Sequence, residues 1–131
     1  MLYGMKEVCA RVDMTYEGLK YYCNQGLVPN MKRDAGNRRM FDERDIAWIE
    51  CLIWLRKCGM GIDDMKRYLA LCLEGPESIP QRQAMLQAQR EQLYDRLLEL
   101  KDSLKYIEEK EQFYADVLAG RRPYESNLID V

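Results

Sequence analysis

Residues 81–119 contain neither glycine nor proline, and this stretch restricts the possible folds more than any other feature of the sequence. Glycine and proline are the strongest local breaks in regular structure. A continuous helix of about forty residues would be roughly 60 Å long. Apolar residues recur along the stretch in steps of four and three, the heptad spacing of helices that pair along a seam. The seam consists of Leu86, Leu93, Leu97, Leu100, Leu104, Ile107, Tyr114 and Leu118, and Glu111 interrupts it.

A lone helix of this length has too few apolar residues to form a core of its own. It must therefore pack against its own domain or against a second chain. We expect a homodimer, with the eight apolar seam residues as its dimerisation surface.

The composition argues against several classes of protein. No run of residues is long and apolar enough to span a membrane, and the start, MLYGMKEV, lacks the apolar core of a signal peptide. The five cysteines are odd in number and form no Cys-x-x-Cys motif, so we expect a cytoplasmic protein with reduced thiols. The chain has no histidine, which removes the usual general base and the commonest metal ligand. We expect no cofactor, no metal and no enzymatic activity.

The charge is distributed unevenly along the chain. Residues 1–72 carry 12 Lys/Arg and 10 Asp/Glu, a net charge of +2, whereas residues 73–131 carry 8 and 12, a net charge of −4. The basic excess is concentrated at Lys32, Arg33, Arg38 and Arg39, against Asp34 alone. A local basic patch on an acidic chain indicates a directed contact with an anionic partner, although a few charges on a solvated turn would look similar.

Turn and capping signals divide the first part of the chain into short elements. Apolar spacing predicts a helix over residues 5–12, and Thr15 is a good N-cap for a second helix that runs to about Asn24. Gly26 and Pro29 then end that helix. Two short helices joined by a tight turn are typical of a helix-turn-helix. Residues 29–41, with turn chemistry at 34–37, predict a basic hairpin placed as a wing.

Two further helices are expected before the long one. Asp42 looks like an N-cap, with Asp45 three residues on, and the helix that follows is apolar on more than one side, as a core helix would be. It should stop at Cys58-Gly59. Asp63 or Asp64 should cap the next helix, which ends before Gly75-Pro76. The domain boundaries that follow are 1–74 for the small domain, 75–120 for the linker and long helix, and 121–131 for a tail.

These segments together resemble the MerR family of bacterial transcription regulators. The resemblance is carried in order by MKEVCA, GLKYYCNQGLVP, RDAGNRRMF and AWIECLIWLRKCGMGIDDMKRYL, and it covers about residues 3–73. The Gly-Asn-Arg at the wing resembles a branch of the family that answers aldehydes and nitrosative stress. The resemblance implies a mainly α fold: a winged helix-turn-helix DNA-binding domain followed by one long dimerisation helix that forms an antiparallel coiled coil.

Family resemblance also implies which residues meet double-stranded promoter DNA. Thr15, Tyr16 and Glu17 start the second helix, the end that reaches base edges in the major groove. Lys20 and Tyr21 are expected to face outward toward phosphates, with Tyr22 inward; Lys20 stands where the family usually has arginine. The remaining predicted contacts are Lys32, Arg33, Asn37, Arg38 and Arg39 in the wing and Lys57 in a second, smaller wing.

The mechanism that the resemblance implies is regulation by deformation. A dimer would bind a palindromic promoter whose spacer is too long for RNA polymerase. A small effector or stress signal would let the dimer bend and untwist the DNA so that the promoter elements realign.

The sequence leaves the sensed signal open. No cysteine or histidine follows residue 72, so metal sensing by thiolate or imidazole is not expected. Thiol sensing could use Cys58, next to Arg56 and Lys57, or Cys72, but each is also explained as a small apolar residue. The aldehyde-responsive branch has its cysteine where this chain has Trp54. Trp54 and Tyr68 could instead line a cavity for a small hydrophobic effector, or simply belong to the core.

Two other functions compete with transcription regulation. An architectural DNA-binding protein of the excisionase kind would use a similar winged helix, but such proteins rarely carry a long coiled coil. A partner-binding module would use the long helix as its docking face without binding DNA. An enzyme is the weakest alternative, because the sequence shows no catalytic constellation.

Overall fold

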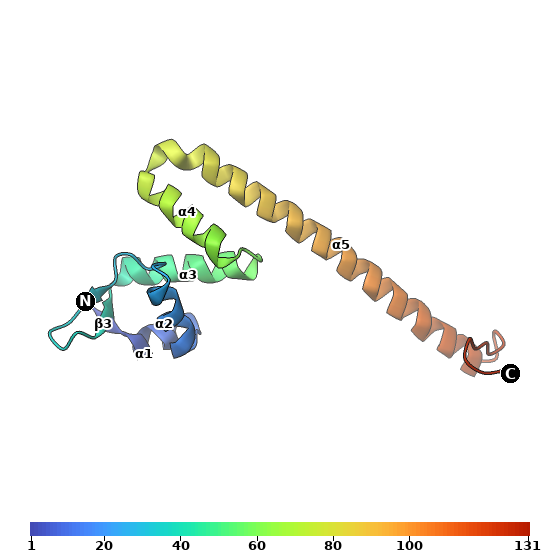
Figure 1. The fold of residues 1–131 in the computed structure, drawn as a ribbon. Coiled ribbons are helices and arrows are strands. Elements are labelled where there is room, and N and C mark those ends of the chain that lie inside the picture. The colour runs from blue at the N-terminus through green and yellow to red at the C-terminus, as the bar shows by residue number, and fades with distance from the viewer. The chain divides into compact units, whose positions relative to one another are not determined.

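The structure, a computed structural model, describes all residues 1–131, and they form two compact units, Met1–Arg90 and Glu91–Val131. The first unit contains a three-stranded sheet and four helices, followed by a short 3-10 turn and the start of a fifth helix (Figure 1). Most of the chain is helical. None of the helices is long and apolar enough to cross a membrane.

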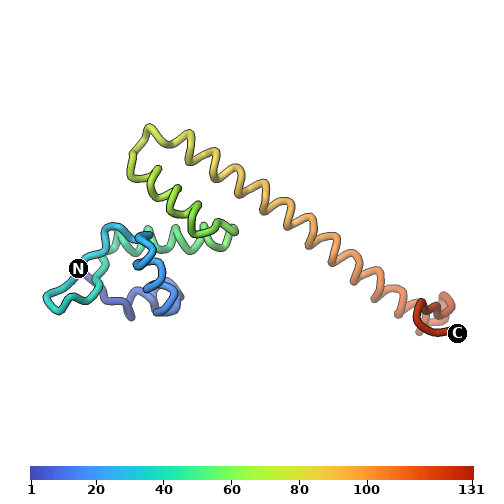
Figure 2. The backbone as a smooth tube through the Cα atoms, in the orientation of Figure 1, coloured from blue at the N-terminus to red at the C-terminus, as the bar shows by residue number.

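The elements follow one another closely along the chain. Their bounds are β1 (Tyr3–Gly4), α1 (Met5–Val12), α2 (Tyr16–Asn24), β2 (Lys32–Arg33), β3 (Arg39–Phe41), α3 (Glu43–Lys57), α4 (Ile62–Glu74), η1 (Pro76–Ser78) and α5 (Ile79–Leu118). Figure 2 traces the backbone from α4 through η1 into α5. The predicted helix-turn-helix, hairpin, core helix and long helix are therefore all confirmed.

The sheet has the strand order β1-β3-β2, and both pairings are antiparallel. β2 and β3 form the hairpin that the sequence predicted. β1 was not predicted; it pairs Tyr3 with Phe41 and Gly4 with Met40. This pairing fixes the start of α1 against the base of the hairpin.

The core of the first unit lies between the helices and the inner face of the sheet. The helices and the sheet each contribute inward-facing side chains to this core, such as Val8 from α1, Leu19 from α2 and Phe41 from β3. α3 contributes the most, which confirms it as the core helix. The buried apolar residues are Met5, Val8, Leu19, Tyr22, Leu27, Val28, Phe41, Ile46, Ile49, Leu52, Leu55, Met60, Met65 and Leu69.

Local caps set the helix boundaries, and one of them differs from the prediction. Asp42 caps α3 as expected: its carboxylate accepts from the Asp45 N–H at 2.8 Å, and Asp45 accepts in return from the Asp42 N–H at 2.9 Å. The expectation that Asp63 or Asp64 caps α4 was wrong. Gly61 is the N-cap, and both aspartates lie in the first turn. There their negative charges still interact favourably with the positive end of the helix dipole.

The start of α5 is held within the first unit. Gln89 donates to the Cys58 carbonyl at 3.1 Å, and Met85 packs against the core. Arg82 donates to the Gly75 carbonyl at 2.6 Å and to the Ser78 hydroxyl at 3.1 Å. The α4–η1–α5 junction is therefore fixed by side-chain hydrogen bonds.

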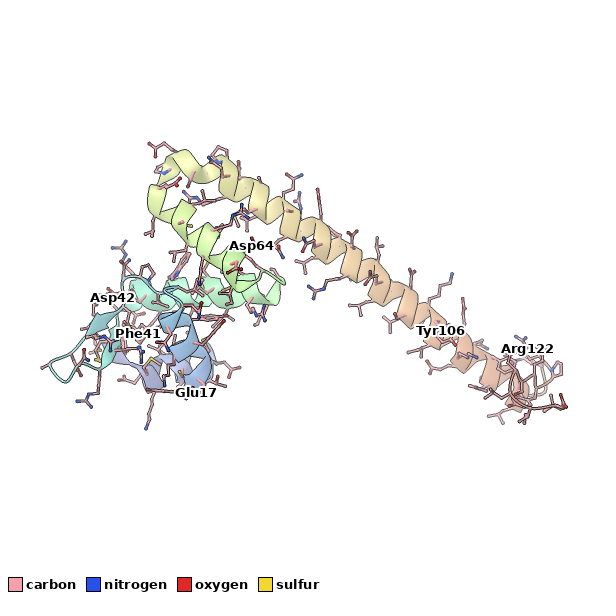
Figure 3. The ribbon with its side chains drawn as sticks, viewed as in Figure 1. Glu17, Phe41, Asp42, Asp64, Tyr106 and Arg122 are labelled. Atoms are coloured by element: carbon pink, nitrogen blue, oxygen red, sulfur yellow. The ribbon has the colours of Figure 1, made fainter.

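The second unit consists of the rest of α5 and a short tail. α5 has 40 residues in all, as the absence of glycine and proline predicted. The side chains of the second unit stand out from the helix, as Figure 3 shows around Tyr106. None of the eight seam residues is buried. At the end of the helix, Arg121 pairs with Asp116 at 2.9 Å, and the Arg122 guanidinium lies 4.6 Å from the Phe113 ring centroid.

Candidate nucleic-acid interface

The turn between α1 and α2 is built around Asp13. Its φ of 55° and ψ of 54° are left-handed, a conformation that aspartate tolerates better than most residues. The Met14 N–H returns to the Cys9 carbonyl at 3.1 Å and closes the turn. The geometry places the start of α2 at the surface.

The first turn of α2 is fixed by its cap. The Thr15 hydroxyl accepts from the Gly18 N–H at 3.0 Å. A Cβ added at Gly18 would lie 2.9 Å from that hydroxyl and 3.4 Å from the Met14 side chain. Any larger residue would therefore crowd the cap, which explains the glycine inside this helix. Thr15, Tyr16 and Glu17 are all exposed.

The two adjacent tyrosines of α2 point to opposite environments. Tyr22 is 7% exposed and packs in the core with Leu19, whereas Tyr21 is 48% exposed. Burial raises the pKa of Tyr22. Lys20 lies half-buried beside this outer face. The inward position predicted for Tyr22 and the outward one predicted for Tyr21 are thus seen in the structure.

The wing is a tight hairpin closed by Asp34. Its backbone N–H donates to the Arg38 carbonyl at 3.0 Å, and its carboxylate accepts from the Arg38 N–H at 2.9 Å. Asn37 takes a left-handed φ of 60°, and its carbonyl accepts from Arg33 Nη1 at 3.0 Å. Asn37 therefore shapes the hairpin tip between the two arginines.

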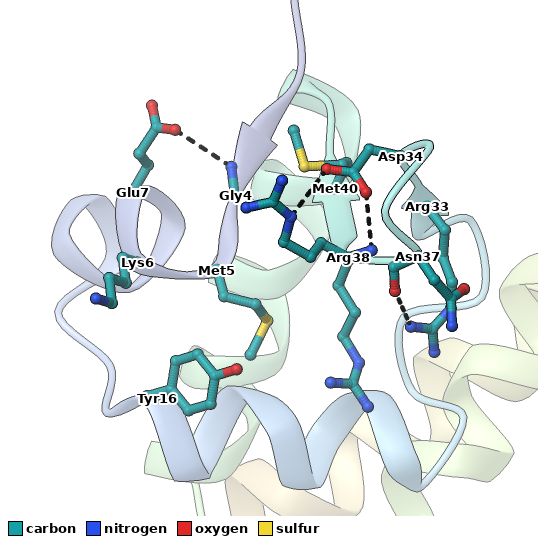
Figure 4. Close-up of a pocket in the computed structure, with 11 residues that line it drawn as sticks. Gly4, Met5, Lys6, Glu7, Tyr16, Arg33, Asp34, Asn37, Arg38 and Met40 are labelled. Carbon is teal, nitrogen blue, oxygen red and sulfur yellow. Dashed lines mark hydrogen bonds and ion pairs between the residues drawn. The ribbon is translucent and has the colours of Figure 1, made fainter.

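A groove of about 640 Å³ lies between the wing, the start of α1 and the start of α2 (Figure 4). Four cationic side chains line it: Lys6, Arg33, Arg38 and Arg39. Tyr16 lies at its α2 side. Its two acidic residues are already engaged, since Glu7 accepts weakly from the Gly4 N–H at 3.4 Å and Asp34 holds the wing turn. The groove is therefore suited to an anion.

Lys6 is the groove residue that sequence reasoning missed. It lies one residue after Met5, which is buried, and is itself exposed. In Figure 4 it is beside Tyr16 on the α1 side of the groove. No local pattern singled it out, because only the pairing of β1 with β3 brings the start of α1 to the wing.

The cations of the basic cluster differ in how free they are. The Arg38 side chain is 83% exposed, and its one ion pair is a long contact of 3.4 Å from Nε to an Asp34 carboxylate oxygen. Arg39 is half-buried: its Nη2 donates to Asn24 Oδ1 at 2.9 Å, and its Nε is buried without a partner. Arg39 thus connects the wing to the end of α2.

Lys32 is the most strongly engaged cation of the cluster. Its ammonium lies 2.7 Å from Asp45 and 3.0 Å from Asp42, and it also donates to the Asn30 carbonyl. The hydrogen bond with Asp45 raises the pKa of Lys32. Two carboxylates neutralise this charge within the protein, and Asp45 is itself buried.

Lys57 ends α3 beside an exposed aromatic ring. Its ammonium lies 4.6 Å from the ring centroid of Trp54, which is 65% exposed. Tyr68 lies elsewhere: its ring stacks on Trp48 with centroids 6.5 Å apart. Trp48 in turn donates to the Leu27 carbonyl at 2.7 Å. Tyr68 therefore pairs with Trp48 rather than with Trp54.

All five cysteines are free thiols and half-buried. Burial raises the pKa of Cys9, Cys23 and Cys51, which opposes thiolate formation at those sites. Cys72 accepts a long contact from Arg82 Nη1 at 3.9 Å. Cys58 contributes its carbonyl to Gln89.

Comparisons with known proteins bear directly on this arrangement. The sequence model of the MerR HTH family regulatory proteins matches residues 3–72, the span that holds the helix-turn-helix, the wing and most of α4. The chain belongs to the MerR family. Members of this family are DNA-binding transcriptional regulators, and this chain is therefore a DNA-binding transcriptional regulator.

Individual relatives extend the match beyond that domain. The chain is 29% identical over 114 residues to an uncharacterized HTH-type transcriptional regulator of Haemophilus influenzae, covering 87% of this chain and 84% of the relative. It is 32% identical over 92 residues to the HTH-type transcriptional regulator AdhR of Bacillus subtilis, covering 70% and 66%.

Solved structures of MerR family regulators share the fold. HiNmlR, a family regulator lacking the sensor domain and crystallised with promoter DNA, is 28% identical, with a TM-score of 0.80 and coverage of 91% of this chain and 90% of that one. A family regulator from Listeria monocytogenes is 27% identical, also with a TM-score of 0.80, covering 90% and 89%.

Proposed function

We propose that this MerR family regulator acts in the cytoplasm as a homodimer that binds a palindromic promoter. Each copy would place the start of α2 in the major groove and its wing against the adjacent backbone. The bound dimer would bend and untwist an overlong spacer, so that RNA polymerase can engage both promoter elements. A small effector or stress signal would set the balance between the two DNA shapes.

The cationic groove beside α2 is the single observation that carries this proposal. Its lysine and three arginines adjoin the exposed N-terminal turn of α2, on one side of the domain. Cationic side chains bind phosphates and fix register, while the end of a helix reads bases. The structural neighbour HiNmlR was crystallised on promoter DNA, which supports the same use of the shared fold.

The geometry ranks the proposed contacts. Arg38 and Arg33 should carry most of the phosphate binding in the wing, and Lys6 adds to them from α1. Arg39 should contribute partly through its contact with Asn24. Lys32 should contribute least, because Asp42 and Asp45 already neutralise it. Lys20 and Tyr21 complete the set on α2, and Lys57 stays a proposal for a second wing.

The dimer is supported by the state of α5. Its apolar seam is uncovered along the second unit, and burying such a surface is the usual source of stability for a long helix. The sensing element is less defined. Cys58 and Cys72 are half-buried, and Trp54 is exposed, so a reactive electrophile or a small apolar effector could reach them from the surface.

The test is an electrophoretic shift with the promoter DNA upstream of the gene, a scrambled duplex of equal length, and a salt titration. We expect selective, salt-sensitive binding by a dimer. Arg38→Ala should lower the slope of log affinity against log salt by about one per subunit, since each phosphate contact releases about one counterion. Lys105→Ala, which removes an exposed cation from α5, is the matched control and should leave the slope unchanged.

Two results would count against parts of the proposal. Equal, weak binding to both duplexes would favour an architectural protein or a partner-docking module. An unaltered salt slope in Arg38→Ala would remove the wing from the interface. Deformation is tested separately, by energy transfer between dyes at the two duplex ends, which should rise when the dimer binds.

A further inference from the structure

The seam of α5 is broken at two positions, and the two carry opposite charges. Heptad positions a and d can be assigned along the helix from its steps of four and three. The d positions hold Leu86, Leu93, Leu100, Ile107 and Tyr114, and the a positions hold Arg90, Leu97, Leu104, Glu111 and Leu118. Arg90 and Glu111 are therefore the charged residues in an otherwise apolar seam.

Neither charge is satisfied within the chain. Both residues are exposed. Neither takes part in any of the ion pairs that the structure contains. On the same helix Lys105 and Glu109 do face each other at 4.0 Å, away from the seam. A charge at position a that has no partner lowers the stability of a pairing helix, so these two call for a partner outside the chain.

The order of residues along the seam is symmetric about Asp102. In an antiparallel pair, each a position lies opposite a d position of the other helix. Centring the two copies on Asp102 places Leu100 opposite Leu104, Leu97 opposite Ile107 and Leu86 opposite Leu118. The same alignment places Arg90 opposite Tyr114 and Leu93 opposite Glu111. The two irregular layers are then neighbours.

We propose that Arg90 of one copy forms an ion pair with Glu111 of the second copy and lies over its Tyr114 ring. This inference rests on the proposed homodimer and specifies the register of its antiparallel coiled coil. Glu111 is three residues from Tyr114, about 4.5 Å along the helix axis, a distance that an arginine side chain spans. The ring offers a cation–π contact to the same guanidinium. The two-fold axis makes the pair twice per dimer.

The pair also disfavours the parallel alternative. In a parallel, in-register dimer Arg90 would face Arg90 and Glu111 would face Glu111, at positions that are desolvated on pairing. Like charges placed there repel each other, whereas the antiparallel arrangement joins opposite ones. The breaks in the seam thus act as its orientation signal, at the cost of two apolar contacts.

The test is a charge-reversal cycle on the full chain, measured as the dimer dissociation constant by sedimentation equilibrium. The proteins are the wild type, Arg90→Glu, Glu111→Arg and the double variant. Each single reversal places like charges together twice per dimer, and we expect the dissociation constant to rise on the order of tenfold or more. The double variant restores opposite charges and should recover most of that loss.

Matched controls separate this effect from a general effect of charge. Lys105→Glu and Glu109→Lys, alone and together, change the same charges on the outer face of α5 and should leave dissociation unchanged. Circular dichroism of each variant at high concentration should show the helix content of the wild type.

The outcomes separate the pair from the dimer on which it rests. A wild-type chain that is monomeric at all concentrations overturns both. A wild-type dimer in which the single reversals have no effect, or in which the double variant is as weak as the sum of the singles, overturns the pair alone. Selective promoter binding by the wild type in the shift assay does not depend on the ion pair, so it would still be expected if the pair alone were overturned.

Discussion

The two units of this regulator differ in how far their apolar side chains are buried and their charged side chains are paired within the chain. In Met1–Arg90 the large apolar residues are mostly buried, and several charged side chains pair within the unit, such as Glu43 with Arg11 at 2.8 Å. In Glu91–Val131 most apolar residues are exposed and none is buried, so the helix has no core of its own. The first unit forms its core from its own residues, whereas the second leaves an apolar seam that the proposed dimer would cover.

This difference shows how stability and function are divided along the chain. Under the proposed function, the domain that presents the cationic groove needs a fixed shape, because its contacts would have to match the spacing of phosphates. The long helix needs only a seam and an orientation. Changes in the first unit should therefore act through folding or DNA contact, and changes in the second through association.

The largest expected effect comes from breaking the seam. Leu97→Asp would bury two carboxylates per dimer, and a desolvated charge without a partner is far more costly than a lost apolar contact. We expect the dimer to dissociate across the micromolar range, measured by light scattering with sedimentation. Leu98→Asp is the matched control: Leu98 is 59% exposed, against 45% for Leu97, but lies outside the seam. A Leu97→Asp protein that remained dimeric would show that another surface joins the copies.

The next effect tests the self-sufficient core of the first unit. Phe41 is fully buried where β3 meets α1 and α3. Phe41→Ala should lower the free energy of unfolding by about 3–5 kcal/mol, the range for deleting a buried phenylalanine ring. Urea unfolding followed by tryptophan fluorescence would measure the loss, because Trp48 packs against this core.

A smaller effect separates the structural role of Thr15 from its proposed DNA contact. Thr15→Ala removes the cap of α2 and should cost about 1 kcal/mol of stability. Thr15→Ser keeps the hydroxyl that accepts from Gly18, so its stability should remain near that of the wild type. Binding to the promoter then distinguishes the two roles. A serine variant that is stable yet changed in sequence preference would show that the threonine methyl group meets a base.

The parts of this fold that could be predicted from sequence depend on local signals. The cap at Thr15 and the capping box at Asp42 each act within a few residues, and the long helix follows from the absence of glycine and proline over residues 81–119. The strand β1 could not be predicted, because a two-residue strand owes its existence to Phe41 and Met40, nearly forty residues away. Gly61 rather than an aspartate is the N-cap of α4, and it makes no side-chain capping hydrogen bond, so no side-chain signal in the sequence marked it.

The sequence predicted which residue types form the candidate site, but not which carboxylates pair with each cation. The sequence placed Lys32 and Arg38 in one basic cluster. The structure gives Lys32 two carboxylates and leaves the Arg38 side chain largely in solvent. Lys6 joins the groove only through the sheet. These distinctions depend on contacts between distant segments, which composition and spacing do not contain.

The smallest expected effect concerns acid stability at the α1–α3 contact. Hydrogen bonds from Arg11 lower the pKa of Glu43 from its usual 4.5 to about 2. A carboxylate whose pKa is lowered by folding stabilises the folded state above its usual pKa, and this contribution is lost as the pH falls from about 4.5 toward 2. Because Glu43 is exposed, solvent screens the pair and the effect should be modest.

Glu43→Gln isolates this contribution. The unfolding midpoint of the variant should lie below that of the wild type at pH 6, and the two should converge as the pH approaches 2. Glu74→Gln, an exposed carboxylate at the end of α4, is the control and should show no such convergence. A constant difference between Glu43→Gln and the wild type from pH 6 to pH 2 would mean that packing of the side chain, rather than its charge, stabilises the contact. The α1–α3 contact of the first unit would then be stabilised by side-chain packing, as its core is.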